Sequence, residues 1–116
     1  MTPLLFVIVA LAGALGAVLR YGVGVAFARQ GFPWAVLTVN VIGSALGGVF
    51  AAGAVSADVR LIVLTGVCGG LTTFSTFSVE TVQLVLEGKT RAAASSVALN
   101  LVLGVGACAA GYALFA

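Results

Sequence analysis

The chain has 116 residues, of which 62% are hydrophobic and only 7% charged, and its mean hydropathy is +1.28. A soluble domain carries about 25% charged residues, so five basic and three acidic side chains cannot cover a globule that faces water. The composition excludes a soluble enzyme and a disordered chain, and a net charge of +2 excludes a nucleic-acid-binding protein. It predicts a single domain, residues 1–116, embedded in a lipid bilayer.

Side chains that could carry out catalysis are scarce. The chain has no histidine, and its carboxylates are Asp58, Glu80 and Glu87. This nearly excludes a Ser-His-Asp triad, metal-dependent hydrolysis and most general acid–base chemistry, so the chain is not expected to be an enzyme. Cys68 and Cys108 lie in apolar runs without metal-ligand or redox spacing, and both are expected to be buried as small hydrophobic residues.

Four apolar blocks follow one another along the chain. A helix needs about 20 apolar residues to cross the hydrocarbon core, and the blocks predict membrane spans at about 4–28, 34–55, 61–86 and 92–115. Polar connections at 29–33, 56–60 and 87–91 separate them, so neighbouring helices must run antiparallel. The first block follows no basic segment, and we expect it to stay in the mature protein rather than to be a cleaved signal peptide.

The charges predict the orientation in the membrane only weakly. Arg29, Lys89 and Arg91 lie in the first and third connections, with Arg20 nearby, whereas Arg60 and the amino terminus lie on the other side. The positive-inside rule favours the first and third connections in the cytoplasm. The imbalance is small enough to permit insertion in both orientations.

Many of the 16 glycines are expected at helix–helix contacts. The segments Gly43–Gly47 and Gly66–Gly70 have the small-xxx-small spacing that lets helix backbones touch. Four short helices enclose little space of their own. We therefore expect the chain to associate with a second chain.

The third block contains an anomaly in the middle of the span. Gly69-Gly70 is followed by Leu71-Thr72-Thr73-Phe74-Ser75-Thr76-Phe77-Ser78, a run rich in hydroxyl groups. Backbone groups at membrane depth must be satisfied, so this run predicts a helix broken in mid-membrane and buried in protein. The alternative is a continuous helix whose hydroxyls bond back to their own carbonyls. A break would leave free carbonyls near Gly69, which suit a cation, and free N–H groups near Thr73, which suit an anion.

Two aromatic residues lie within the hydroxyl-rich run. Phe74 and Phe77 are three positions apart and share a helical face. Taken alone, they would be two core aromatics. Beside hydroxyl groups, the positive edges of their rings can contact a small anion without the full charge that would trap it.

Neutral polar residues also lie inside the second, third and fourth spans. Asn40 and Asn100 lie deep in their spans, Ser96 precedes Asn100 by four residues, and Thr76 lies in the hydroxyl run. One interpretation is ordinary hydrogen bonding between helices. The other is a track of amide and hydroxyl donors that replaces the hydration shell of an anion.

Two ionisable residues lie near this track. Arg20 either snorkels to the membrane surface without a further role or raises the concentration of anions at a pore mouth. Glu80 follows Thr76 by four positions and lies beside the face of Phe77. A carboxylate inside a membrane is a functional candidate by default, but the sequence leaves the role of Glu80 open.

Three motifs of this chain resemble those of the CrcB/Fluc fluoride channels, small bacterial membrane proteins through which fluoride leaves the cell passively. They are Gly16-Ala17-Val18-Leu19-Arg20-Tyr21, Thr38-Val39-Asn40-Val41-Ile42-Gly43-Ser44, and Gly69-Gly70-Leu71-Thr72-Thr73-Phe74-Ser75-Thr76-Phe77-Ser78-Val79-Glu80. The resemblance covers essentially the whole chain, and the third motif is its most specific part.

The resemblance implies a fluoride channel of the bacterial inner membrane that confers fluoride resistance, built as an antiparallel, dual-topology homodimer in the lipid bilayer. It implies a structural sodium ion at the dimer centre, held by the backbone carbonyls of Gly69 and Thr72. It also implies that Phe74 and Phe77 line the fluoride pathways, with Asn40 as the second-helix asparagine and Arg20 in the vestibule. Some family members pair unlike chains, which leaves an unlike partner open.

The fourth span departs from the family pattern. Many members carry a tyrosine and a serine four residues apart there, whereas this chain has Ser96 and Asn100. Both positions remain polar.

Two other functional classes were weighed. A small four-helix multidrug or cation exporter needs a carboxylate in the first span, and this chain has Arg20 there and no acid. A non-transporting scaffold subunit would explain the glycines but not the hydroxyl-rich third span.

Overall fold

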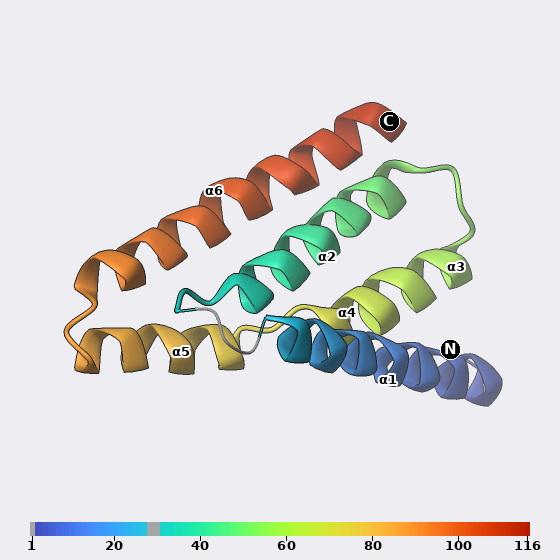
Figure 1. Ribbon diagram of the computed structural model, residues 1–116. Coiled ribbons are helices and arrows are strands. Elements are labelled where there is room, and N and C mark those ends of the chain that lie inside the picture. Colours follow the sequence, from blue (N-terminus) through green and yellow to red (C-terminus); the bar gives the residue numbers. More distant parts are fainter. Residues whose placement is uncertain (1, 28–30) are drawn as a thin grey trace.

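The computed structural model describes residues 2–27 and 31–116, and this part of the chain is built from helices (Figure 1). Four helical segments are long and apolar enough to cross a membrane: Pro3–Ala26, Trp34–Ala52, Ala57–Leu86 and Thr90–Phe115. The predicted all-helical fold with four such segments is confirmed. The predicted end of the first span at residue 28, and residues 29 and 30 of the first connection, lie outside the described residues.

The first two helices begin with clear local signals. In α1 (Pro3–Ala26), the hydroxyl of Thr2 accepts a hydrogen bond from the N–H of Leu5 at 3.1 Å, and proline takes the first helical position, where its missing N–H costs nothing. Helix α2 (Trp34–Ala52) begins after Pro33 and ends where Gly53 becomes extended. At its start, the tilted rings of Trp34 and Phe32 pack together with their centroids 4.7 Å apart.

The third helical segment starts earlier than predicted. Helix α3 (Ala57–Leu61) runs directly into η1 (Ile62–Cys68), a π-helical stretch, and then into α4 (Gly69–Leu71). The Ser56 hydroxyl accepts from the N–H of Val59 at 3.2 Å, and Asp58 in the first turn suits the positive end of the helix dipole. The expected connection at 56–60 is therefore wrong for most of its length, because Ser56 acts as a helix cap.

Helix α4 ends at Leu71, and helical structure resumes at Ser75. Thr72 is extended, with φ −76° and ψ 156°, and α5 (Ser75–Leu86) begins three residues later. The interruption thus lies a few residues beyond Gly69. The chain then turns at Gly88, whose φ of 79° favours glycine, and the N–H of Lys89 reaches back to the Leu84 carbonyl at 2.8 Å.

Helix α6 (Thr90–Phe115) packs along α2, while α1 packs against η1 and α4, as Figure 1 shows. Glycines make these contacts close. A Cβ on Gly70 would overlap the carbonyl of Gly13 in α1, and a Cβ on Gly111 would overlap the carbonyl of Ala45 in α2. The prediction that the glycines serve helix packing is confirmed at these contacts.

The two cysteines have different surroundings. Cys68 is buried, as expected, but Cys108 is exposed on α6. The expectation was wrong for Cys108 because its backbone, rather than its side chain, faces α2, where a Cβ on Gly48 would overlap its carbonyl.

Candidate functional site

Asn40 of α2 binds the interruption between α4 and α5. Its Oδ1 accepts a hydrogen bond from the N–H of Thr73 at 2.9 Å, and its Nδ2 donates to the carbonyl of Thr73 at 3.2 Å. The same Nδ2 donates to Oδ1 of Asn100 in α6 at 3.0 Å. Asn100 in turn donates from Nδ2 to the Ser96 carbonyl at 2.8 Å. A series of hydrogen bonds made by side chains therefore links α2, the interruption and α6.

The carbonyls on the two sides of the interruption differ in their partners. The carbonyl of Cys68 accepts from the N–H of Thr72 at 3.0 Å and from its hydroxyl at 2.8 Å, and that of Gly70 accepts from Nε of Arg20 at 3.2 Å. Within residues 2–27 and 31–116, no donor contacts the carbonyls of Gly69 and Thr72. These two carbonyls, three residues apart in the sequence, are thus left available to another ligand.

The hydroxyl groups of the run divide into two kinds. Thr72, Ser78 and Thr81 each donate to the carbonyl four residues back, at 2.7 to 2.8 Å, which is the behaviour expected of hydroxyls in a membrane helix. Thr73 differs, because its hydroxyl accepts from the N–H of Thr76 at 3.1 Å and caps the start of α5. Its own hydroxyl proton has no acceptor in the described part of the chain.

A cavity of about 490 Å³ opens beside the interruption. Its polar and aromatic lining comes from three helices and includes Asn40, Ser44, Thr73, Phe74, Phe77 and Asn100. Among the residues that the structure describes, no charged side chain lines it. The cavity can therefore surround a small ion with neutral amide, hydroxyl and ring-edge groups.

The two phenylalanines lie together at this cavity. Their ring centroids are 6.0 Å apart with the planes tilted by 46°, and Phe74 is 80% exposed in the isolated chain. A large aromatic side chain this exposed beside amide and hydroxyl groups is not part of the chain's own core. The alternative that Phe74 is a core aromatic is therefore wrong for the isolated chain.

A second, smaller cavity lies on the other side of Thr73. Its volume is about 80 Å³, and its polar lining consists of Arg20, Thr73, Thr76 and Glu80. Oε2 of Glu80 is buried and has no hydrogen-bond partner in the described part of the chain. Thr73 lines both cavities, so it separates the neutral cavity from the charged one.

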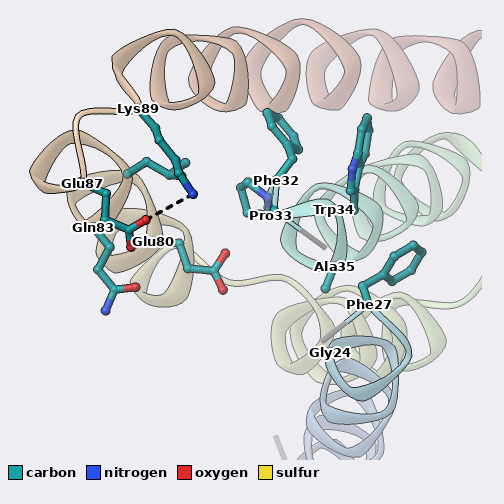
Figure 2. Close-up of a pocket in the computed structure, with 12 residues that line it drawn as sticks. Gly24, Phe27, Phe32, Pro33, Trp34, Ala35, Glu80, Gln83, Glu87 and Lys89 are labelled. Carbon is teal, nitrogen blue, oxygen red and sulfur yellow. Dashed lines mark ion pairs between the residues drawn. The ribbon is translucent and has the colours of Figure 1, made fainter. Parts of the chain in front are cut away.

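Glu80 also borders a third cavity, at the end of the bundle where the first and third connections meet. This cavity of about 370 Å³ is shown in Figure 2, with Glu80, Gln83, Glu87 and Lys89 on one side and Phe32 and Trp34 on the other. Lys89 and Glu87 form an exposed ion pair at 3.4 Å there. The cavity thus combines charged and amide side chains of α5 and the following turn with aromatic side chains at the start of α2.

A family profile described as CrcB-like protein, Camphor Resistance (CrcB), matches residues 7–112. The chain belongs to the CrcB family.

Several curated members of the CrcB family are similar over nearly their full length. The fluoride-specific ion channel FluC of Nitrobacter winogradskyi is 43% identical, with 89% of this chain and 88% of that protein aligned. The fluoride-specific ion channel FluC 1 of Thermobifida fusca is 45% identical, over 90% of this chain and 89% of that protein. The FluC protein of Renibacterium salmoninarum is 43% identical, over 97% of this chain and the whole of that protein.

Membership of the CrcB family and the four apolar helices together make the chain a multi-pass protein of the bacterial cell membrane. The profile match includes the interruption and all three cavities. The site described above therefore lies within the part of the chain that the family shares.

The residues predicted from the sequence fall into three groups in this CrcB protein. Asn40, Asn100, Phe74 and Phe77 line the large cavity, and the small cavity is lined by three others, Arg20, Thr76 and Glu80. Ser96 lines neither; it is 1% exposed, and its carbonyl anchors Asn100. Thr73 was expected near the start of the second half-helix, but nothing in the sequence predicted that its hydroxyl caps α5 or that it lines both cavities.

Proposed function

We propose that this chain is a fluoride-specific ion channel that lets cytoplasmic fluoride leave the cell passively. The observation that carries the proposal is the neutral cavity lined by Asn40, Phe74, Phe77 and Asn100 beside the helix interruption, in a chain of the CrcB family. Relatives that align over nearly their whole length carry the name fluoride-specific ion channel.

The chemistry of fluoride suits this cavity. Fluoride is small and strongly hydrated, so a site must present donors densely enough to replace water. The hydroxyl of Thr73, the amide of Asn100 and the ring edges of Phe74 and Phe77 can act together, and none of them carries a full charge that would hold the ion too tightly. Chloride is larger and gains less from such close donors.

The small cavity extends the proposed pathway toward the membrane surface. Arg20 and Thr76 line it together with Glu80. Glu80 also borders the cavity of Figure 2, which is the proposed entrance from the membrane surface. The positive charge of Arg20 raises the local concentration of anions. Ser96 contributes indirectly, by holding Asn100 in the large cavity.

We further propose that two copies of the chain form an antiparallel, dual-topology homodimer. The large cavity is open at the side of the isolated chain, and Phe74 at its rim is mostly exposed. In a bilayer, this polar wall would face lipid, which cannot satisfy amide and hydroxyl groups. A second copy covers the cavity. The numbers of basic residues on the two sides of the membrane are nearly equal, which permits both orientations.

Within the dimer, a structural sodium ion is proposed at the interruption. Within the described residues, no group of three His, Cys, Asp or Glu side chains could hold a metal ion, and the ligands we propose are backbone carbonyls. The carbonyls of Gly69 and Thr72 fit, because they are oxygen donors without another partner in the described chain and Gly69 is exposed. A bound sodium ion supplies positive charge that offsets the carbonyl dipoles of both copies.

The rival functions receive less support. An exporter of cationic drugs would need a carboxylate in the first span, and α1 has none. A scaffold subunit would not need a neutral donor cavity at a helix interruption.

The test is fluoride efflux from liposomes that hold the purified chain, measured with a fluoride electrode and compared with chloride efflux. We expect fluoride to leave rapidly after the membrane potential is collapsed by a potassium ionophore, while chloride remains inside. Equal efflux of both ions, or no fluoride efflux from a well-folded protein, would contradict the proposed function. In the second case, co-purification from the native membrane would reveal an unlike partner chain.

A further inference from the structure

We infer that Asn40 is a positioning residue, which shapes the pathway through the backbone of Thr73 and makes no direct bond to the transported ion. The inference rests on the proposed function for its link to transport. Its structural part, the control of the Thr73 peptide groups, can be tested without any ion.

The hydrogen-bonding groups of the Asn40 carboxamide are already engaged within the chain. Its two Nδ2 protons are directed to the carbonyl of Thr73 at 3.2 Å and to Oδ1 of Asn100 at 3.0 Å. Its Oδ1 accepts from the N–H of Thr73 at 2.9 Å. Since an amide nitrogen has only two protons, Asn40 has no donor left for an anion in the cavity that it lines.

This pairing replaces two hydrogen bonds of a continuous helix. There, the N–H of Thr73 would donate to the carbonyl of Gly69, and the carbonyl of Thr73 would accept from the N–H of Phe77. Asn40 takes both places, with a geometry like that of a neighbouring peptide group. It thereby satisfies the backbone at the interruption and leaves the Gly69 carbonyl and the Phe77 N–H free for other ligands.

The position of Asn40 is itself set from α6. Asn100 accepts from Asn40 and is held by its own bond to the Ser96 carbonyl. Ser96 is almost fully buried, so this end of the relay has little freedom to move. The start of α5, with Phe74 and the Thr73 hydroxyl, is therefore aligned with α6 through Asn40.

The experiment measures hydrogen–deuterium exchange of the Thr73 amide, at single-residue resolution, in purified protein without fluoride. In Asn40→Ala, we expect exchange at Thr73 to be roughly tenfold faster, because its acceptor is lost. In Asn40→Asp, we expect exchange to stay within about twofold of wild type, because the carboxylate still accepts the Thr73 N–H. Should Asn40→Ala not fold, Asn40→Ser, which is too short to bond both Thr73 groups, should show the same increase.

Ser44→Ala is the matched control. Ser44 lies one turn further along α2 and lines the same cavity, but it makes no hydrogen bond to Thr73. Exchange at Thr73 should be unchanged in this variant. An equal increase in Ser44→Ala and Asn40→Ala would mean general loosening of α2 and would overturn the inference.

Fluoride efflux of the same proteins completes the test. Both Asn40→Ala and Asn40→Asp should lose efflux, the second because it lacks the donors to Thr73 and Asn100. Loss of efflux in Asn40→Ala with Thr73 still protected would identify Asn40 as a direct ligand and overturn the inference. If the variants show the expected exchange at Thr73 but the wild-type protein gives no fluoride efflux, the proposed function is refuted. The pairing of Asn40 with Thr73 is then still supported.

Discussion

At the scale of single residues, the same side-chain type has different tasks at neighbouring positions. Thr72 donates its hydroxyl back to the Cys68 carbonyl, whereas Thr73 uses its hydroxyl to accept from the N–H of Thr76. The first completes the end of a helix and the second starts the next one. Their order in the sequence is what separates α4 from α5.

Phe74 and Phe77 give the sharpest prediction at this scale. Phe74→Ile and Phe77→Ile keep a large apolar side chain at the cavity but remove the aromatic ring and its positive edge. We expect each variant to reduce the fluoride efflux rate by roughly tenfold, which corresponds to the loss of an interaction of about 1.4 kcal/mol. Efflux from liposomes measures the rate, and size-exclusion chromatography checks that the variants still assemble.

Phe6→Ile is the control for this prediction. Phe6 is 66% exposed on α1 and lines none of the three cavities. Efflux should be unchanged in this variant. Wild-type efflux from both Phe74→Ile and Phe77→Ile would remove these rings from the pathway.

At the scale of helices, the contact between α1 and the third helical segment depends on missing side chains. Gly66 and Gly70 face α1, and Gly16 of α1 faces the backbone of Val67 and Leu71. The helix axes can approach closely only because no Cβ lies between them. Gly66 and Gly70 therefore pack the third helical segment against α1, and the chain leaves the helical path only at Thr72.

Gly70→Ala tests this contact. The added methyl group would overlap the Gly13 carbonyl and crowd the N–H of Ala17 in α1. We expect a loss of about 1–3 kcal/mol in the free energy of unfolding, as for other overpacked sites, measured by titration with a denaturing detergent.

The matched control is Gly106→Ala. A Cβ at Gly106 of α6 would meet nothing within 4 Å. Alanine is also the better helix former, so this variant should be as stable as wild type or slightly more stable. If Gly70→Ala were equally stable, the close approach of α1 and α4 would not be required.

The end of α2 shows a second kind of helix contact. Nε of Arg60 donates to the carbonyl of Phe50 at 3.1 Å and Nη2 donates to that of Gly53 at 3.2 Å. These bonds satisfy carbonyls that the end of α2 leaves without helical partners. Arg60, which the sequence placed in a polar connection, thus links α2 to the start of the third helical segment.

At the scale of the whole molecule, one chain leaves much of its functional surface uncovered. Helix α5 packs mainly against α6, and Val79, Val82 and Leu86 on α5 are exposed together with Phe74. The chain measures 48 × 29 × 21 Å, and the large cavity beside the interruption is open at its side. The proposed homodimer supplies the missing wall.

Dual topology is testable with a single cysteine. Ala57 is exposed at the first position of α3, and Ala57→Cys can be introduced after Cys68 and Cys108 have been replaced by alanine. In intact cells, a membrane-impermeant maleimide should label about half of the chains, because opposed copies place residue 57 on opposite sides of the membrane. Permeabilised cells, in which all chains should react, give the reference. Labelling of all chains or of none in intact cells would contradict dual topology.

The sequence by itself determined the membrane class, the four helices and the family motifs, because these depend on composition and on runs of apolar residues long enough to cross a bilayer. It also indicated the cavity residues Asn40, Phe74, Phe77 and Asn100, since polar groups inside apolar spans are costly and therefore informative. The sequence did not predict the π-helical stretch of η1 or the cap at Ser56. It placed the end of the first half-helix near Gly69, whereas α4 ends at Leu71.

Only the tertiary structure decided which of these polar groups bond to one another. Asn40 and Thr73 are 33 residues apart, and Arg20 and Gly70 are 50 apart, so no local spacing rule relates them. Their pairing follows from the close packing of α1, α2 and α6 around the interruption, which brings a side-chain amide to a peptide group that has lost its helical partner. Sequence shows which groups need partners in a membrane, but the packed helices decide which partner each one finds.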